Sequence, residues 1–281
     1  MANKTLKEIL NKAIILKEED AFRQDVYYLA QKVFSLSYND LFLKGNNIYD
    51  DMEFNEKFQR YLDGEPLYYI LKEAPFYGRM FEVNPNVLIP RNETEELILL
   101  TLNKIKEFSF ENPRILEIGT GSGCIAITLK AELSKSDVTS VDISSNCLEV
   151  ATINSIKHNV DIDFYISDCL EEVVNKKQTF DVLVSNPPYI DRDTFVEESV
   201  LKYEPHLALF ADNHGLAIYE KIFTNLDKVL NEKAFCLFEI SPDLKEGLIA
   251  LIEKYINSYK YEFIQDINGF TRFLFLKKKE G

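Results

Sequence analysis

The chain has 281 residues, of which 46% are hydrophobic and 28% are charged, a composition typical of a folded globular protein. Its 32 basic and 46 acidic side chains give a formal net charge of −14. A protein that grips nucleic acid through its phosphates needs clustered Lys and Arg, so the charge argues against duplex DNA as a partner. A local basic patch remains compatible with this average.

Cysteine usage and hydropathy indicate the compartment. Cys124, Cys147, Cys169 and Cys236 form no C-x-x-C pair, and the three histidines have no ligand spacing, so neither disulfides nor a metal site are predicted. The N-terminal apolar run, residues 13–16, is too short for a signal peptide. No stretch approaches the roughly 18 apolar residues of a membrane span. We expect a cytoplasmic protein that does not enter membranes.

The first part of the chain is predicted to be helical. Apolar residues recur at helical spacing between Leu6 and Phe34. Shorter helical patterns follow after Asn39 and over residues 54–66, where Gly64 ends the last of them. We therefore expect a helical N-terminal domain over residues 1–75.

A connecting hairpin is predicted over residues 76–90. Its sequence, FYGRMFEVNPNVLI, alternates polar and apolar side chains, as a strand with one buried face does. The turn is expected at Asn84-Pro85-Asn86, because Asn and Pro favour turns.

Residues 91–281 are predicted to form an α/β domain. From Arg114 onward apolar strands alternate with helical patterns, and the strands are expected at 114–118, 137–143, 163–167, 180–185, 234–240, 262–267 and 270–276. Strands separated by helices pair in parallel through right-handed crossovers, so we expect an open, doubly wound sheet. The last two strands flank Asn268-Gly269, a hairpin signal that places one antiparallel strand in the sheet.

A glycine-rich turn follows the first strand of this sheet. It is formed by Glu117, Gly119, Thr120, Gly121, Ser122 and Gly123. Glycines let the backbone turn sharply and let a ligand approach main-chain N–H groups. The G-x-G-x-G spacing matches neither the dinucleotide fingerprint nor a P-loop.

Acidic residues end the next two strands. Asp142 ends the second strand, where a carboxylate can accept hydrogen bonds from both ribose hydroxyls, and Asp168 ends the third, where it can reach an adenine. Cys169 would lie beside the base. With the turn, these residues predict a site for a nucleoside with little phosphate, for which S-adenosylmethionine is the obvious candidate. The alternative is a tight strand-to-helix turn with a solvated aspartate.

A second motif, Asn186-Pro187-Pro188-Tyr189, directly follows the strand at 180–185. Ligands of open α/β sheets bind at the carboxyl ends of the strands, so this loop should face the glycine-rich turn. The Asn186 side-chain carbonyl and the Pro187 main-chain carbonyl supply two acceptors, which suit a planar –NH2 group. Holding that group in line with a methyl sulfonium favours methylation of an amide or exocyclic amine. The alternative is a proline-stiffened strand exit.

At these residues the chain resembles the HemK/PrmC family, the N5-glutamine methyltransferases that modify class 1 peptide chain release factors. The resemblance covers nearly the whole chain. The segments that carry it are Asp63–Pro66, Phe76–Gly78, Leu88–Arg91 with Glu93–Glu95, Glu117–Gly123, Asn186–Ile190, Tyr203–Pro205, Gly215–Leu216, and Asp266 with Gly269 and Arg272. The chain departs from the family pattern at Asn92, usually proline, at Cys169, often aromatic, and at Ser241, commonly glycine.

The resemblance implies a fold, a cofactor and a partner. The fold is that of the class I S-adenosylmethionine-dependent methyltransferases, with a Rossmann-like, seven-stranded, mostly parallel sheet ending in an antiparallel hairpin and a small N-terminal helical bundle. The implied donor is S-adenosylmethionine, which leaves as S-adenosylhomocysteine. The implied protein substrate is a class 1 release factor, held in part by the N-terminal helices while its Gly-Gly-Gln loop enters the cleft. We expect a monomer without stable nucleic-acid binding.

The resemblance also assigns roles to residues. The donor would be held by Glu117, Gly119, Thr120, Gly121, Ser122, Gly123, Asp142, Asp168, Cys169 and Asn186. Asn186, Pro187 and Tyr189 would be catalytic, and the substrate would contact Asn186, Pro187, Pro188, Tyr189, Arg91 and Thr94.

Three other functions stay open at this point. An N6-adenine methyltransferase could use the same loop, but it needs a flipped base and a basic groove, which the charge of −14 disfavours. A ribosomal-protein glutamine methyltransferase would use identical chemistry. A donor-binding module without catalysis is opposed by the intact Asn186 and Tyr189.

Overall fold

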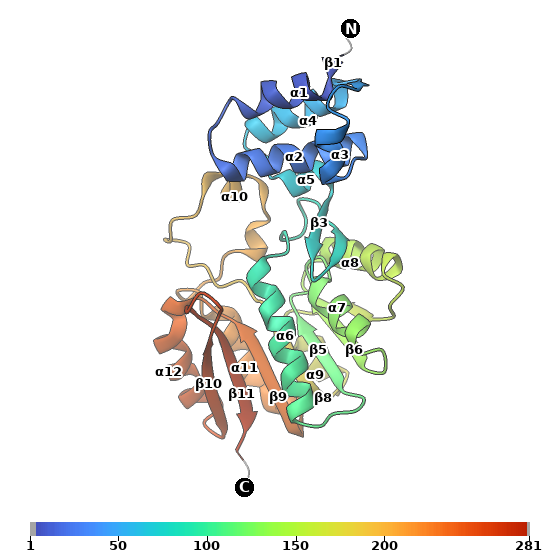
Figure 1. The fold of residues 1–281 in the computed structure, drawn as a ribbon. Coiled ribbons are helices and arrows are strands. Elements are labelled where there is room, and N and C mark those ends of the chain that lie inside the picture. Colours follow the sequence, from blue (N-terminus) through green and yellow to red (C-terminus); the bar gives the residue numbers. More distant parts are fainter. Residues whose placement is uncertain (1–3, 280–281) are drawn as a thin grey trace. The chain divides into compact units, whose positions relative to one another are not determined.

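The computed structural model describes residues 4–279, and the chain divides between Lys72 and Glu73 into two compact units (Figure 1). Among the described residues, no helix combines the length and apolarity that crossing a bilayer requires. The same residues contain no group of three or more His, Cys, Asp or Glu side chains arranged to hold a metal ion.

The N-terminal unit is a helical bundle. Its elements are β1 (Lys4–Thr5), α1 (Leu6–Ile14), α2 (Asp20–Phe34), α3 (Tyr38–Leu43), β2 (Ile48–Tyr49), α4 (Met52–Leu62) and α5 (Leu67–Leu71). Capping boxes at Thr5 and Ser37 start α1 and α3, because each hydroxyl accepts a hydrogen bond from an N–H of the first turn. The apolar stripe of each long helix faces a shared core that includes Leu6, Leu29 and Phe54. Helix α5 and the short β1–β2 pair were not predicted.

The connecting hairpin lies earlier than predicted. Strand β3 (Glu73–Phe76) pairs with β4 (Arg79–Glu82), so the hairpin covers residues 73–82 rather than 76–90. Its turn is Tyr77-Gly78, and both residues have positive φ angles, as tight hairpin turns require. The predicted turn at Asn84-Pro85-Asn86 does form, with the N–H of Val87 donating to Asn84 O at 3.1 Å, but it follows the hairpin instead of joining its two strands.

The second unit contains a seven-stranded sheet in the order β10-β11-β9-β8-β5-β6-β7. The strands are β5 (Arg114–Ile118), β6 (Asp137–Asp142), β7 (Asp163–Ile166), β8 (Phe180–Ser185), β9 (Leu230–Glu239), β10 (Tyr259–Gln265) and β11 (Thr271–Lys278). Five of them pair in parallel, and β11 is antiparallel to both of its neighbours. The predicted doubly wound sheet with one antiparallel strand from a C-terminal hairpin is confirmed.

Helices cover both faces of this sheet. Alternate side chains of a strand enter opposite cores: Ile115 belongs to the core beneath α6 and α7, and Leu116 to the core beneath α9, α11 and α12. The helices of this unit are α6 (Asn92–Glu107), α7 (Cys124–Glu132), α8 (Ser145–Lys157), α9 (Glu171–Asn175), α10 (Glu198–Tyr203), α11 (Ala217–Val229) and α12 (Lys245–Tyr255), with 3-10 turns at His206–Ala208 and Pro242–Leu244. Helix α6 was not predicted, and it proves important below.

Candidate active site

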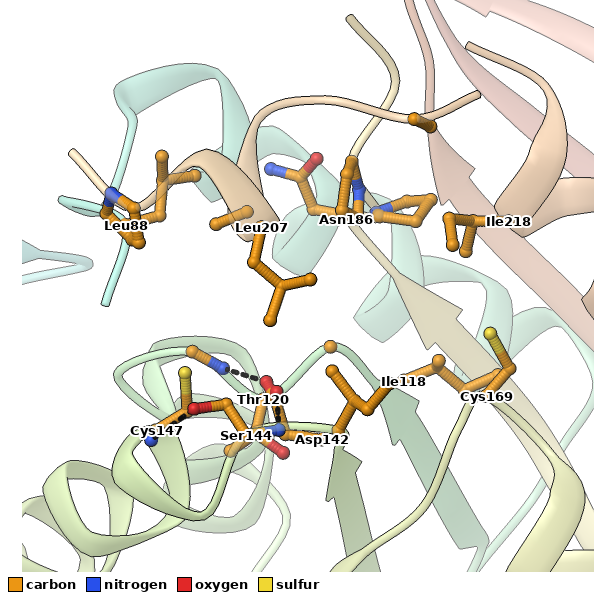
Figure 2. A pocket seen from close by; sticks show the side chains of 18 of the residues that line it. Leu88, Ile118, Thr120, Asp142, Ser144, Cys147, Cys169, Asn186, Leu207 and Ile218 are labelled. Carbon is orange, nitrogen blue, oxygen red and sulfur yellow. Dashed lines mark hydrogen bonds between the residues drawn. The ribbon is translucent and has the colours of Figure 1, made fainter. Parts of the chain in front are cut away.

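A cavity of about 470 Å³ opens at the carboxyl ends of the parallel strands (Figure 2). Most of the predicted site residues line it: Arg91, Thr94, Glu117, Gly119, Thr120, Gly121, Ser122, Asp142, Asp168, Cys169, Asn186, Pro187 and Pro188. The glycine-rich turn and the loop after β8 thus face the same space. Gly123 and Tyr189 are the two predicted residues that do not line it.

The glycine-rich turn forms one wall. Gly119, Gly121 and Gly123 all have positive φ angles. A Cβ on Gly123 would lie 2.9 Å from Ile127 Cδ1 and 3.0 Å from Ala151 Cβ, so this glycine allows α7 to pack closely on α8. A Cβ on Gly121 would meet nothing within 4 Å, because that position faces open space. Gly123 therefore has a packing role, whereas Gly121 leaves room for a ligand.

Glu117 ends β5 as a buried carboxyl group, only 1% exposed. The Ser140 hydroxyl donates to its Oε2 at 2.5 Å, and Thr120 bonds to Ser140 at 2.7 Å. Its Oε1 has no hydrogen-bond partner within residues 4–279. Burial raises the pKa of Glu117 to about 8. An acceptor oxygen buried at a cavity wall without a partner is suited to a cationic ligand.

The Asp142 carboxyl group accepts hydrogen bonds from the glycine-rich turn and from the turn that follows β6. The N–H of Gly121 donates to its Oδ2 at 3.0 Å, and the N–H of Ser144 donates to its Oδ1 at 2.9 Å; Figure 2 shows the group on the cavity floor. Burial raises the pKa of the Asp142 carboxyl group. Each carboxylate oxygen keeps a free lone pair, so the group can still accept from a ligand.

The far end of the same wall is formed by Asp168 and Cys169. Both Asp168 oxygens contact Lys221 Nζ, at 2.7 and 3.0 Å. Cys169 has a φ angle of +52°, and burial raises the pKa of its thiol to about 12. The thiol therefore stays protonated and acts as a small apolar contact. The sequence pattern gave no signal for Lys221, because it lies on a half-exposed helix face.

The opposite wall is the loop after β8. The loop is fixed on both sides, since the N–H of Ile190 donates to Leu209 O and the N–H of Ala211 donates to Ile190 O, both at 3.0 Å. Gly215 supports it from behind: a Cβ there would lie 2.3 Å from the carbonyl oxygen of Tyr189. The prolines and these contacts hold Asn186 and Pro187 at the cavity.

The Asn186 side chain is the first member of a buried chain of hydrogen bonds. Its Nδ2 donates to Thr94 Oγ1 at 3.1 Å, and Thr94 Oγ1 donates to Glu239 Oε2 at 2.7 Å. Thr94 stands in the first turn of α6, and Glu239 ends β9. The Asn186 Oδ1 has no hydrogen bond among the described residues. Glu239 was missed, although a lone glutamate in the apolar stretch AFCLFEI could have signalled a special position.

Tyr189 does not line the cavity. Its side chain packs on the core beneath α11 and α12, and burial raises its pKa to about 12. The negative charge of the nearby Glu239 carboxyl group adds to the rise in the Tyr189 pKa. A contact between Tyr189 and the substrate stays a prediction.

The rim contains an ion pair and an apolar side chain that were not predicted. Arg91 contacts Glu204 at 2.6 Å, and Glu204 also accepts from the N–H of Ile89 at 3.4 Å. Leu207, which is 59% exposed, points into the cavity between its two walls (Figure 2). The neighbouring Tyr-Glu-Pro segment was noted only as part of the resemblance.

Comparison with known proteins agrees with this geometry. Residues 93–207 match the model of the methyltransferase small domain. A methyltransferase from Pyrococcus furiosus superposes with a TM-score of 0.54 at 20% identity, over 79% of this chain and 98% of that one. The Thermus thermophilus 16S rRNA N2 G1207 methyltransferase, solved with AdoMet and guanosine, gives a TM-score of 0.54 at 16% identity, over 74% of this chain and 50% of that one.

At these identities the two solved structures establish the fold alone, which is that of a methyltransferase. A release factor glutamine methyltransferase from Staphylococcus aureus is 40% identical over 280 residues, which cover 96% of this chain and 98% of the relative. Two proteins that are this similar over their full lengths are members of one family. The chain therefore belongs to the release factor glutamine methyltransferase family.

Proposed function

We propose that this chain transfers a methyl group from S-adenosylmethionine to the side-chain amide nitrogen of the glutamine in the Gly-Gly-Gln motif of class 1 release factors. The name of the Staphylococcus aureus relative supports the reaction and the substrate class. The cavity supports it independently, because one wall offers the buried Glu117 and the partly buried Asp142 and Asp168 carboxyl groups, and the other offers an unpaired amide oxygen.

The buried carboxyl groups fit the donor. S-adenosylmethionine supplies a methyl group on a positively charged sulfonium, an electrophile that requires no strong general base. An α-ammonium group near Glu117 would satisfy the partnerless Oε1 and lower the pKa of this carboxyl group from its value of about 8. Asp142, fixed by two backbone N–H groups, retains lone pairs for ribose hydroxyls. Asp168, beside Lys221, is the candidate for the adenine amine.

The opposite wall fits a primary amide. Asn186 donates through Nδ2 to Thr94, so its Oδ1 is the atom left to accept from a substrate –NH2 group. Pro187 has no N–H, and its carbonyl oxygen is the second acceptor in the proposal. Two acceptors hold both hydrogens of the amide, which orients the nitrogen toward the donor and favours a pyramidal transition state. The free Asn186 oxygen is the observation that carries this assignment.

The charges around the cavity weigh against a nucleic-acid substrate. Its lining contains three basic side chains, and each is paired with a carboxylate: Arg91 with Glu204, Arg192 with Asp212, and Lys221 with Asp168. Paired cations contribute little to phosphate binding, because their charge is already neutralised. An adenine amine remains chemically similar to a glutamine amide, so nucleic acid is retained as an arm of the test.

We also propose that the N-terminal unit contacts the release factor. Several of its large apolar side chains are more than half exposed, namely Ile15, Leu16, Phe42, Leu43 and Ile48. Exposed apolar side chains that lie together can form a protein-binding surface, and Ile15 with Leu16 and Phe42 with Leu43 are neighbours in the sequence. The enzyme would act as a monomer in the cytoplasm, where translation terminates.

The test is a transfer assay with a methyl-labelled donor. The purified chain is incubated separately with a class 1 release factor, with the same factor carrying Gly-Gly-Ala in place of Gly-Gly-Gln, with a ribosomal protein fraction, and with DNA. We expect label on the intact factor and none on its substituted form. Label only on ribosomal proteins, or only on DNA, would contradict the proposed substrate.

A further inference from the structure

Glu239 is a buried charged residue that none of the roles above uses. It is 2% exposed and ends β9, a strand whose neighbouring positions are apolar. It does not line the cavity. Burying a carboxyl group costs free energy unless hydrogen bonds compensate, so its partners indicate what it does.

The sheet register places Glu239 directly beside the amide-binding loop. Strands β8 and β9 are parallel neighbours in which Ser185 pairs with Phe238, so the next position on each strand is Asn186 and Glu239. Thr94, in the first turn of α6, bridges the two, with 2.7 Å to Glu239 Oε2 and 3.1 Å to Asn186 Nδ2. The N-terminus of α6 favours a negative charge at this place.

The Thr94 hydroxyl has a single hydrogen, and this fixes the direction of the two hydrogen bonds that join Asn186, Thr94 and Glu239. An ionised Glu239 is only an acceptor, so Thr94 must donate to it. Thr94 can then only accept from Asn186, and the group that faces it must be the –NH2 end of the carboxamide. The oxygen end stays free for the ligand. This conclusion depends on counting hydrogens and not on the assigned positions of the Asn186 oxygen and nitrogen atoms.

We propose that Glu239 is a positioning residue that acts through Thr94 to hold the Asn186 carboxamide with its oxygen, not its nitrogen, available to the substrate. The identity of that substrate rests on the proposed function, whereas the hydrogen-bond relay does not. Selection of an –NH2 donor over a carboxylate follows, because a carboxylate would need the opposite end of Asn186.

The surroundings of Glu239 give the relay a pH dependence. Burial raises the pKa of Glu239 to about 7. The Thr94 hydrogen bond, the charge of Arg272 and the nearby Tyr189 side chain oppose this rise, and the charge of Glu93 adds to it. Tyr219 lies nearby and bonds to the main-chain oxygen of Glu239 at 2.6 Å. Below pH 7 the protonated carboxyl group can donate to Thr94, which can then donate to the Asn186 oxygen. The free acceptor is lost, so kcat at saturating donor should fall as the pH drops through about 7.

The kinetic test compares four variants in methyl transfer to the release factor. Thr94→Val keeps the shape and removes the hydroxyl, and Thr94→Ser restores it. Glu239→Gln keeps the size and removes the obligatory acceptor. Thr101→Val is the matched control, because it removes a buried hydroxyl of the same helix that bonds only to Leu97 O.

We expect Thr94→Val and Glu239→Gln to lower kcat by about 10–100-fold with donor Kd changed less than twofold, since misplacing a reacting group costs about this much. Thr94→Ser should recover most of the loss, Thr101→Val should match the unsubstituted enzyme, and Glu239→Gln should lose the fall in kcat below pH 7. Near-normal kcat in Thr94→Val, or an unchanged pH profile in Glu239→Gln, would overturn the proposal.

A second measurement separates this proposal from the proposed function. Side-chain NMR of Asn186 in the enzyme without release factor should show –NH2 protons protected from exchange, and Thr94→Val should remove that protection while Thr94→Ser retains it. If the release factor is not methylated but the protection behaves in this way, the substrate is wrong and the relay stands. Protection that is absent, or insensitive to Thr94→Val, contradicts the relay whatever the substrate.

Discussion

The two walls of the cavity are held together in different ways. On the part of the donor wall between Glu117 and Asp142, the hydrogen bonds join residues close in the sequence: Gly121 and Asp142 are 21 positions apart, and Glu117 and Ser140 are 23 apart. On the amide wall, Asn186 bonds to Thr94 across 92 positions, and Thr94 bonds to Glu239 across 145. That part of the donor wall is built within one β-α-β unit, whereas the amide wall requires that α6, β8 and β9 all be in place.

This difference suggests a division of roles that substitutions can test. Changes on the donor wall should alter donor affinity, because the groups there are fixed by their own neighbours. Changes on the amide wall should alter kcat and leave donor affinity almost unchanged.

Asn186→Ala should have the largest effect. It removes the acceptor that orients the substrate amide, so we expect kcat to fall by about 100-fold or more. Donor Kd, measured by calorimetry, should stay within twofold. Asn231→Ala is the matched control, because its side chain bonds to Asp181 at 2.7 Å, at the start of β9 and away from the cavity. A parallel collapse of donor affinity in Asn186→Ala would contradict the separation of the two walls.

Gly215→Ala should disturb the amide wall from behind. The new Cβ would lie 2.3 Å from the carbonyl oxygen of Tyr189, so the loop must move, and we expect kcat to fall by about tenfold or more. Gly269→Ala isolates the backbone strain, because its φ of +84° matches the +85° of Gly215 and its Cβ meets nothing within 4 Å. Thermal unfolding should show both variants destabilised, by about 1–2 kcal/mol from the φ angle. Equal kcat values would show that the close contact has no catalytic consequence.

Asp142→Ala should weaken the donor wall. Loss of hydrogen bonds between a carboxylate and the donor costs about 1.5–3 kcal/mol, or about 10–150-fold in donor Kd. Asp181→Ala serves as the control, since Asp181 also accepts a backbone hydrogen bond, from Arg114 at 2.8 Å, outside the cavity. If calorimetry finds the same donor Kd in Asp142→Ala, the proposal that Asp142 binds the ribose hydroxyls of the donor is contradicted.

Glu117→Gln should change the stability of the protein in a pH-dependent way. The pKa of Glu117 is raised from 4.5 to about 8 on folding, so its stabilising contribution is complete below pH 4.5 and is lost as the pH rises through about 8. Glutamine does not ionise, so the variant should gain stability relative to the unsubstituted enzyme between pH 5 and pH 9, measured without donor. The same variant should bind the donor more weakly. A stability difference that does not change with pH would contradict the raised pKa.

The same contrast explains what could be predicted from the sequence. The strands, the sheet and the glycine-rich turn were predicted because apolar periodicity and glycine spacing are local signals. Asp142 followed from its place at the end of a strand. These features lie within short segments whose physical requirements can be read directly.

The amide wall was only half predicted. Asn186 and Pro187 were identified by their motif, but α6 was missed, and the resemblance gave Thr94 only a substrate-contact role. The partnership of Thr94 with Glu239 depends on which strands are neighbours, and strand order is a long-range property. The hairpin was misplaced for a smaller reason: both turn signals form turns, but the weaker, Tyr77-Gly78, is the one that joins two paired strands.

The most direct test of the central claim is the chemical identity of the product. Tandem mass spectrometry of release factor treated with enzyme and isotopically labelled donor should find one added methyl group on the side-chain nitrogen of the Gly-Gly-Gln glutamine. Asn186→Ala enzyme should leave that peptide unmodified while still binding the donor. A methyl group on another residue, or full modification by the Asn186→Ala enzyme, would contradict the account.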